Sequence, residues 1–84
     1  MQQAIKIHSR DNVAVALQDL AAGTEVIVAE QRITLQQDIG RGHKFALQPL
    51  NSGEQVIKYG LPIAHATQPI AVGELITPAT RAPI

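Results

Sequence analysis

Apolar and polar residues alternate along several short stretches of the chain. In residues 5–7 two Ile flank a Lys, and in residues 13–17 Val and Leu alternate with Ala. A period of two places the larger apolar side chains on one face of a strand. Three further stretches, 26–28, 45–47 and 56–59, are short β-branched or aromatic runs bounded by turn residues. The pattern predicts an all-β fold made of short strands.

One segment, residues 11–23, also fits a helix. Asp11 could cap such a helix, three apolar residues would share one of its faces, and Gly23 would follow its end. We favour a strand followed by a turn, because residues 19–23 match a motif that recurs three more times along the chain.

This motif is Asp or Pro, then Leu or Ile, two free positions, Gly, two free positions and an apolar residue. Asp can accept a hydrogen bond from a backbone N–H two or three residues on, and Pro fixes φ, so both start tight turns. The Leu or Ile would anchor the turn in the core, and Gly would supply the positive φ that ends it. The copies begin at Asp19, Asp38, Pro49 and Pro69.

The spacing of the motif glycines predicts a pseudo-two-fold internal repeat. Gly23 and Gly53 are 30 positions apart, and Gly42 and Gly73 are 31 apart. A solenoid would space all four copies evenly, and these are not evenly spaced. We therefore expect two related halves within one domain.

Length and composition fit a small domain with a thin core. We expect the domain over residues 1–76, and an irregular C-terminal tail or linker over residues 77–84, which contain two prolines. A chain of 84 residues buries only roughly 60% of its unfolded surface. Its apolar residues are mostly small, with one Phe, one Tyr and no Trp. A homo-oligomer or a stabilising partner is therefore expected.

Charge and cysteine content exclude several function classes. Lys and Arg together number seven, as do Asp and Glu, and no run of like charge occurs. This argues against nucleic acid or an anionic membrane as a partner. The absence of Cys excludes disulfides and thiolate metal sites within this chain. The first residues match neither a signal peptide nor a transit segment, so we expect a cytoplasmic location.

Several segments carry a resemblance to a known family. The sequence resembles the N-terminal domain of altronate and galactarate dehydratases, and it is also similar to the small subunit of sulfolactate sulfo-lyase. The resemblance implies the SAF, or β-clip, fold, and it extends from about residue 8 to residue 73. The segments that carry it are 11–17, 42–47 (Gly-His-Lys-Phe-Ala-Leu) and 56–60 (Val-Ile-Lys-Tyr-Gly), followed by Pro62-Ile63.

The resemblance implies a role in a hydro-lyase that removes water from a sugar acid with the help of a divalent metal, iron or manganese. The large part of such enzymes is absent from this chain. We therefore expect a small subunit or accessory domain that covers the active site of a large dehydratase-like subunit and has no activity alone. One departure concerns residues 75–80, Leu-Ile-Thr-Pro-Ala-Thr, where the family usually has a Val-His-x-His-Asn segment.

The second copy of the turn motif is the main candidate site. Only this copy places two potentially cationic residues, His43 and Lys44, after its glycine, and Arg41 precedes that glycine. Such a cluster suits a sugar-acid carboxylate, with Arg41 and Lys44 binding substrate. His43 is the candidate catalytic residue, because an imidazole can transfer a proton near neutral pH. The competing interpretation is a solvated turn without a role.

Lys58, Asp11 and His8 are further candidates for substrate binding. Lys58 falls where other copies of the motif place an aliphatic residue, so its charge should either reach the surface or meet an acceptor. We expect Asp11 to be its counter-ion. His65 is expected to be incidental, and Tyr59 to be a half-buried strand residue. The histidine spacing predicts no metal site within this chain.

Two other functions are compatible with the sequence. A SAF module that binds or assembles without catalysis would explain the divergent residues 75–80. A carbohydrate-binding module is less well supported, because such sites stack sugars on aromatic side chains and this chain has few.

Overall fold

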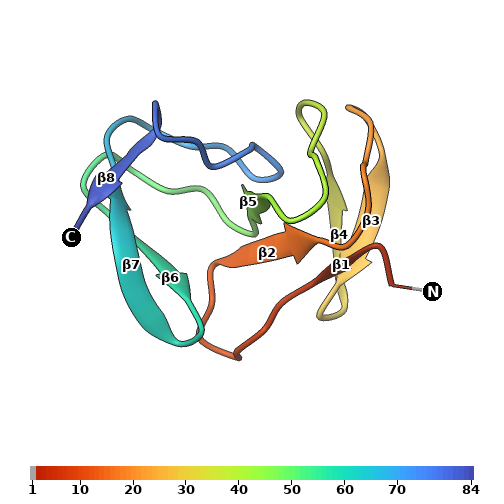
Figure 1. The fold of residues 1–84 in the computed structure, drawn as a ribbon, viewed down its shortest axis with the longest axis horizontal. Helices are drawn as coiled ribbons and strands as arrows, with labels where there is room; N and C mark the ends of the chain where they lie inside the picture. The colour runs from red at the N-terminus through yellow and green to blue at the C-terminus, as the bar shows by residue number, and fades with distance from the viewer. Residues whose placement is uncertain (1) are drawn as a thin grey trace.

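The computed structural model describes residues 2–84, which form short antiparallel strands and turns without a helix (Figure 1). The all-β prediction is confirmed, and residues 13–16 form a strand, as favoured over a helix. No segment of residues 2–84 is a helix long and apolar enough to cross a membrane. The strands are β1 (Ala4–Ile5), β2 (Val13–Ala16), β3 (Glu25–Val28), β4 (Gln31–Thr34), β5 (Lys44–Ala46), β6 (Gln55–Lys58), β7 (Leu61–Ala66) and β8 (Arg81–Pro83).

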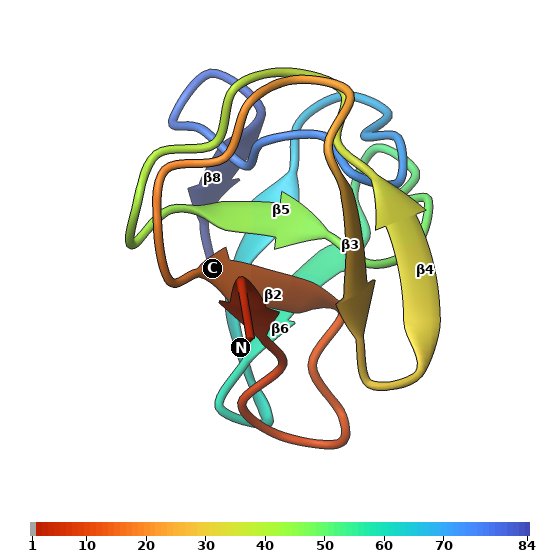
Figure 2. The same cartoon turned by 90° about the vertical axis from the view of Figure 1, so that its right-hand side faces the viewer.

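The strands form three small sheets. Their orders are β1-β2-β5, β3-β4 and β6-β7-β8. Figure 1 shows the β3–β4 hairpin on one side and the β6-β7-β8 sheet on the other, with β2 and β5 between them, and Figure 2 shows β2 and β5 crossing the molecule side by side. In this central ladder Val15 lies opposite Lys44.

The four turn motifs fold as predicted in most respects. Their glycines have φ values of +83°, +85°, +91° and +80° in chain order. Their Leu or Ile residues are buried and pair two by two: Leu20 exchanges backbone hydrogen bonds with Ile39, and Leu50 with Ile70. The first three motifs lead into β3, β5 and β6, whereas the fourth leads only to a single bridge formed by Leu75.

The predicted role of the motif aspartates is wrong in one respect. Asp19 and Asp38 do not accept a bond from within their own turns. Instead, Asp19 Oδ1 accepts from the backbone N–H of Arg41, and Asp38 Oδ1 accepts from that of Ala22, at 2.9 Å each. The two turns lie face to face through the Leu20–Ile39 bridge, so each carboxylate reaches the neighbouring turn more directly than its own.

Backbone hydrogen bonds relate the halves of the molecule in the predicted way. The N–H of each motif glycine donates to the carbonyl of a residue in a strand or directly after one, at least 12 positions away in sequence. In the first and third motifs, which correspond in the two halves, the glycine–acceptor pairs are Gly23–Leu35 and Gly53–Ala66. In the second and fourth motifs they are Gly42–Ala16 and Gly73–Ala46. A Cβ at Gly73 would collide with the Thr34 carbonyl oxygen, so this glycine allows the halves to approach closely.

Two strands that the sequence pattern did not indicate, β4 and β7, complete two hairpins. Each hairpin has a two-residue turn with positive φ at both positions, Ala29-Glu30 in one and Tyr59-Gly60 in the other. Tyr59 is therefore a turn residue, 60% exposed, and not the half-buried strand residue that we expected.

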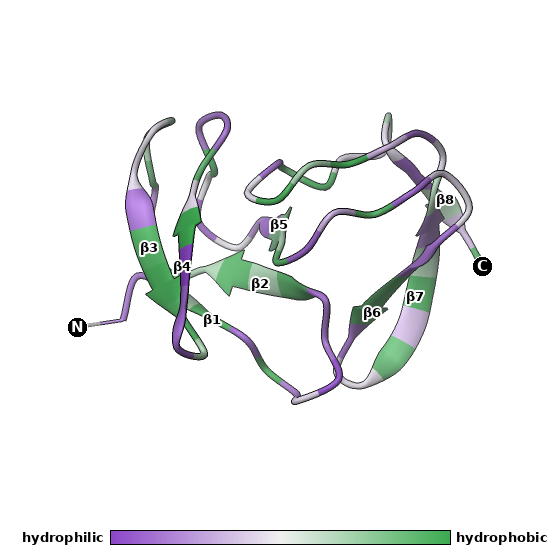
Figure 3. Ribbon diagram, turned by 180° about the vertical axis from the view of Figure 1, so that it is seen from behind, coloured by the Kyte–Doolittle hydropathy of each residue, from purple (hydrophilic) through white to green (hydrophobic). Residues whose placement is uncertain are grey.

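The apolar side chains form two clusters. The first gathers residues of β1, β3, β4 and the first two turns, and the second gathers residues of β6, β7 and the last two turns. Strands β2 and β5 serve both: Ala14 and Phe45 face the first cluster, whereas Val13 and Ala46 face the second. Figure 3 shows these strands as largely apolar and the connecting loops as more polar.

The C-terminal residues are more ordered than the expected irregular tail. Arg81–Pro83 form β8, which pairs with β7. Thr77 and Thr80 hold the preceding turn: Thr77 N–H donates to Thr80 Oγ1 at 3.0 Å. Proline is compatible with this strand because β8 lies at the sheet edge.

Candidate functional site

A pocket of about 390 Å³ lies between the second turn motif and the C-terminal segment. Its lining residues come from the turn before β5, from β5 itself, from the segment after the fourth motif, and from β8. They are Gly42, His43, Lys44, Leu75, Ile76, Thr77, Pro78 and Arg81. The backbone fixes the two walls against each other, because Ile76 N–H donates to the Lys44 carbonyl at 2.9 Å.

Two of the predicted site residues, His43 and Lys44, meet in this pocket. Lys44 is half-buried on β5, and His43 is exposed in the turn before it. Arg81 is the basic residue of the opposite wall, and sequence reasoning missed it. The only signal for it was its basic charge, since it lies in a segment without periodicity or motif.

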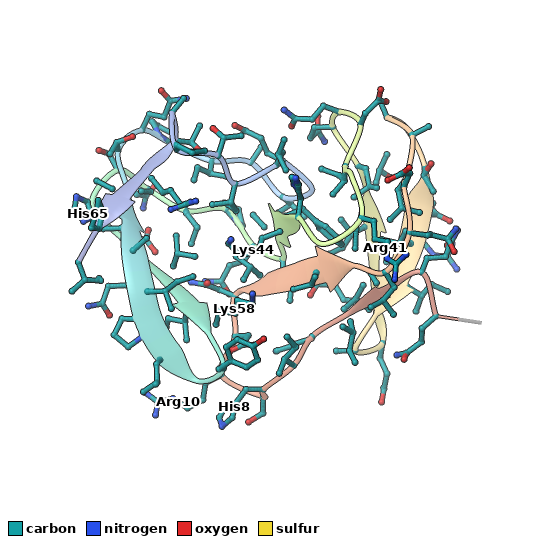
Figure 4. The ribbon with its side chains drawn as sticks, viewed as in Figure 1. His8, Arg10, Arg41, Lys44, Lys58 and His65 are labelled. Atoms are coloured by element: carbon teal, nitrogen blue, oxygen red, sulfur yellow. The ribbon has the colours of Figure 1, made fainter. Side chains whose placement is uncertain are left out.

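Lys58 lies close to this cluster. Figure 4 shows Lys44 and Lys58 in the centre of the view, between the two halves of the molecule. Burial is the main reason that the pKa of Lys44 is lowered, and the positive charges of Arg81 and Lys58 lower it further. The charges of two of the seven Lys and Arg side chains, Arg81 and Lys58, therefore act on a third, Lys44.

Within residues 2–84, none of these three cations has a carboxylate partner within 4.0 Å. The single ion pair in that part of the chain joins Arg32 to Glu25 at 3.6 Å, on the β3–β4 hairpin. Lys58 Nζ instead lies 4.9 Å from the centroid of the Tyr59 ring, a cation–π contact. The pocket is therefore a positively charged site without internal neutralisation.

The expected ion pair between Lys58 and Asp11 is not formed, because backbone donors occupy the carboxylate. Asp11 is 4% exposed, and it accepts from the N–H of Gly60 at 2.7 Å and of His8 at 3.0 Å. Burial alone would raise the pKa of Asp11, but the backbone hydrogen bonds from Gly60, His8 and Tyr59, together with the charge of His8, lower it overall.

The remaining predicted residues lie apart from the pocket. His8 is in the loop between β1 and β2, where its Nδ1 accepts from the N–H of Arg10 and its ring packs against Gly60. Arg41 lies on the side of the β3–β4 hairpin in Figure 4, and His65 lies at the opposite edge, beside β8. The structure thus separates Arg41 and His8 from Lys44, although all three were expected to bind substrate.

The described residues do not fit a metal centre. Nowhere in residues 2–84 do three or more His, Asp or Glu side chains lie close enough together to hold an ion. The pocket lining offers one imidazole, that of His43, and no carboxylate, which is too few ligands to hold iron or manganese.

Comparison with known proteins identifies relatives over almost the whole chain. Residues 2–80 match the family model described as the altronate/galactarate dehydratase SAF domain. An altronate dehydratase of Escherichia coli K12 is 63% identical over 71 residues, and one of Bacillus subtilis 168 is 45% identical over 76 residues. A galactarate dehydratase (L-threo-forming) of Escherichia coli K12 is 36% identical over 74 residues. These alignments cover 84%, 90% and 86% of this chain, but only 14%, 15% and 14% of the relatives.

Proposed function

Because the chain belongs to the family of altronate/galactarate dehydratase SAF domains, we propose that it serves as the small subunit or accessory domain of a sugar-acid dehydratase. The observation that carries this proposal is the similarity to the Escherichia coli altronate dehydratase, which is 63% identical over 84% of this chain. The same alignment covers 14% of that relative. Such identity supports a shared role for the aligned part, and the low coverage means that most of the relative has no counterpart in the aligned residues.

The pocket beside β5 is the part of this domain that would face the reaction. Elimination of water takes a proton from one carbon and a hydroxyl from its neighbour, so a group that moves protons near neutral pH is required. His43 carries an imidazole, the side chain that most often transfers protons in enzymes, and it is exposed and borders the pocket. Lys44 would hold the negatively charged acid nearby.

A divalent metal, if the complete enzyme uses one, would be held by the large subunit. Residues 2–84 contain no group of three or more His, Asp or Glu side chains that could hold an ion. The contribution of this chain would then be to cover the site, to present His43 and Lys44, and to exclude water from the substrate.

A second function, assembly without catalysis, is favoured by one observation. The divergent segment at residues 75–80 borders the pocket with Leu75, Ile76, Thr77 and Pro78, where imidazoles were expected from the resemblance. A SAF module could bind the large subunit through this face and contribute no proton transfer.

Complementation in trans tests both functions. The large fragment of the Escherichia coli altronate dehydratase, without its segment that aligns with this chain, would be mixed with this chain and assayed for dehydration of altronate. We expect each part to be inactive alone and the mixture to be active. His43→Gln should remove most of the restored activity, and His65→Gln, which changes a histidine outside the pocket, should not.

The outcomes separate the alternatives. A complex that forms without restoring turnover would favour the assembly function. Failure to form a complex, or turnover by the isolated chain, would contradict the proposed accessory role.

A further inference from the structure

The pocket beside β5 has an excess of positive charge that the composition does not explain. The chain has equal numbers of acidic and basic residues, yet Lys44 and Arg81 line the pocket and the charges of Arg81 and Lys58 act on Lys44. No carboxylate in residues 2–84 lies within 4.0 Å of these three cations. Bringing like charges together in a partly buried place is unfavourable unless an anion neutralises them.

Arg81 has a buried N–H group without a hydrogen-bond acceptor among the described residues. This group is the Nε–H, which is shielded from solvent. Buried polar groups without a partner are rare in folded proteins, and each one costs free energy. A small shift of the side chain toward an acceptor in the pocket would satisfy this N–H.

The shape and lining of the pocket suit a small organic anion. A volume of about 390 Å³ lies within the range of small-ligand sites. Leu75, Ile76 and Pro78 provide apolar walls, whereas the Thr77 hydroxyl and the His43 ring provide polar groups beside the cations. The guanidinium of Arg81 can bind a carboxylate through two parallel N–H donors, and Lys44 can add a third from the opposite wall.

We propose that this pocket is a carboxylate-binding site in which Arg81 is the principal ligand and Lys44 the second. The guanidinium, the positive charge and the apolar walls of the pocket support a carboxylate ligand independently of the proposed function. Its assignment to a polyhydroxy acid, with hydroxyls directed to Thr77 and His43, rests on the proposed function. The same carboxylate chemistry could also be supplied by an Asp or Glu side chain of the large subunit.

The two sources are distinguished by titration of the isolated chain. Galactarate, acetate and the uncharged galactitol would be added to the 15N-labelled protein while amide signals are followed by NMR. For a free acid we expect both carboxylates, but not galactitol, to shift the signals of residues 43–44 and 75–81. Arg81→Gln should weaken galactarate binding at least tenfold, whereas Arg41→Gln, which removes an exposed arginine outside the pocket, should leave it unchanged.

If free acids do not bind, the same variants are tested in the complex with the large dehydratase fragment. Weaker association of Arg81→Gln, with normal association of Arg41→Gln, would assign the carboxylate to the large subunit. If Arg81→Gln does not give the dispersed spectrum of a folded protein, Lys44→Gln replaces it in both arms, with the same expectation.

The proposal is overturned if neither the binding of free carboxylates nor the association with the large fragment depends on Arg81 or Lys44. This result is separable from failure of the accessory role. If the large fragment binds wild type and Arg81→Gln equally well, the accessory role still holds. If galactarate binding depends on Arg81 but no complex forms with the large fragment, the carboxylate site holds and the accessory role fails.

Discussion

At the scale of single residues, the buried pair Asp11 and Asn12 has the clearest structural role. Asn12 donates to the Gln55 carbonyl and accepts from the Ile57 N–H, both at 2.8 Å, while Asp11 accepts from the Gly60 N–H. Together they attach the loop before β2 to strand β6 and to the β6–β7 turn. The family-like residues at this position therefore stabilise the fold and do not neutralise Lys58.

Replacement of Asp11 tests this role. Asp11→Asn keeps the shape of the side chain but turns an NH2 group toward one of the two backbone donors. We expect a loss of about 1–3 kcal/mol in the free energy of unfolding, measured by urea denaturation. Glu30→Gln, at the exposed tip of the β3–β4 hairpin, is the matched control and should change stability little; equal effects of the two substitutions would contradict the assignment.

The same carboxylate predicts how stability depends on pH. The pKa of Asp11 is lower in the folded chain than its ordinary value of 3.8. Its contribution is therefore complete above the unfolded pKa and is lost as the pH falls through the folded pKa, because the unfolded chain then binds the proton more strongly. Wild type should lose stability below about pH 4 more steeply than Asp11→Asn.

The pocket residues show what sequence could and could not predict. The second motif copy identified His43 and Lys44, because the position of a residue after the turn glycine determines where its backbone lies at the start of the next strand. It also suggested Arg41, but in the structure the Arg41 side chain lies on the side of the β3–β4 hairpin, away from the pocket. Arg81 approaches Lys44 only through the pairing of β8 with β7, a contact between distant segments that no local pattern contains.

At the scale of elements, the turn motif was the most informative feature of the sequence. It predicted the positive φ at four glycines and the burial of the four Leu or Ile residues, since both are local requirements of a tight turn. It did not reveal that Asp19 and Asp38 exchange hydrogen bonds between turns, because this depends on which turns face each other.

Three strands, β4, β7 and β8, have no predicted counterpart, and the first two have weak local signals for physical reasons. In β4 only Ile33 is buried, so alternation is hardly visible. In β7 the pairing with β6 shifts register between Val56 and Ile57, and Pro62 interrupts the pattern. Both strands are held in place by their hairpin turns and by the core, and not by their own composition.

The β3–β4 turn offers a stability prediction. Ala29 and Glu30 have φ values of +49° and +66°, which side chains with a Cβ rarely adopt, whereas the equivalent β6–β7 turn ends in glycine. Glu30→Gly relieves this strain, and we expect about 0.5–1 kcal/mol of added stability and a higher Tm. Gln31→Gly, one residue later in β4, should lower the Tm; a decrease for both variants would show that the turn is not strained.

At the scale of the whole molecule, the two apolar clusters are joined by one shared element. Adjacent residues of β2 and of β5 point alternately into the first and the second cluster. Separation of β2 from β5 would therefore remove packed side chains from both clusters. Gly73 adds a second contact, since its carbonyl accepts from the Gln36 N–H at 3.0 Å, between the two halves. We infer that the pseudo-repeated halves unfold together.

A matched pair of core substitutions tests this inference. Ile39 and Ile70 occupy the same motif position, one in each cluster, and are 0% and 2% exposed. Ile39→Val and Ile70→Val each remove one buried methylene, at a cost of about 1 kcal/mol. In a chain of this size each should lower the Tm by about 4–8 °C, in a single transition by circular dichroism.

Hydrogen exchange resolves whether that transition is shared by both halves. The Ile39 amide donates to the Leu20 carbonyl in the first cluster, and the Ile70 amide donates to the Leu50 carbonyl in the second. If both open only by global unfolding, either substitution accelerates the exchange of both amides by the same factor, about fivefold for 1 kcal/mol. If the halves open separately, Ile39→Val accelerates its own half and leaves the Ile70 amide unchanged, and the shared ladder would then not couple the two clusters.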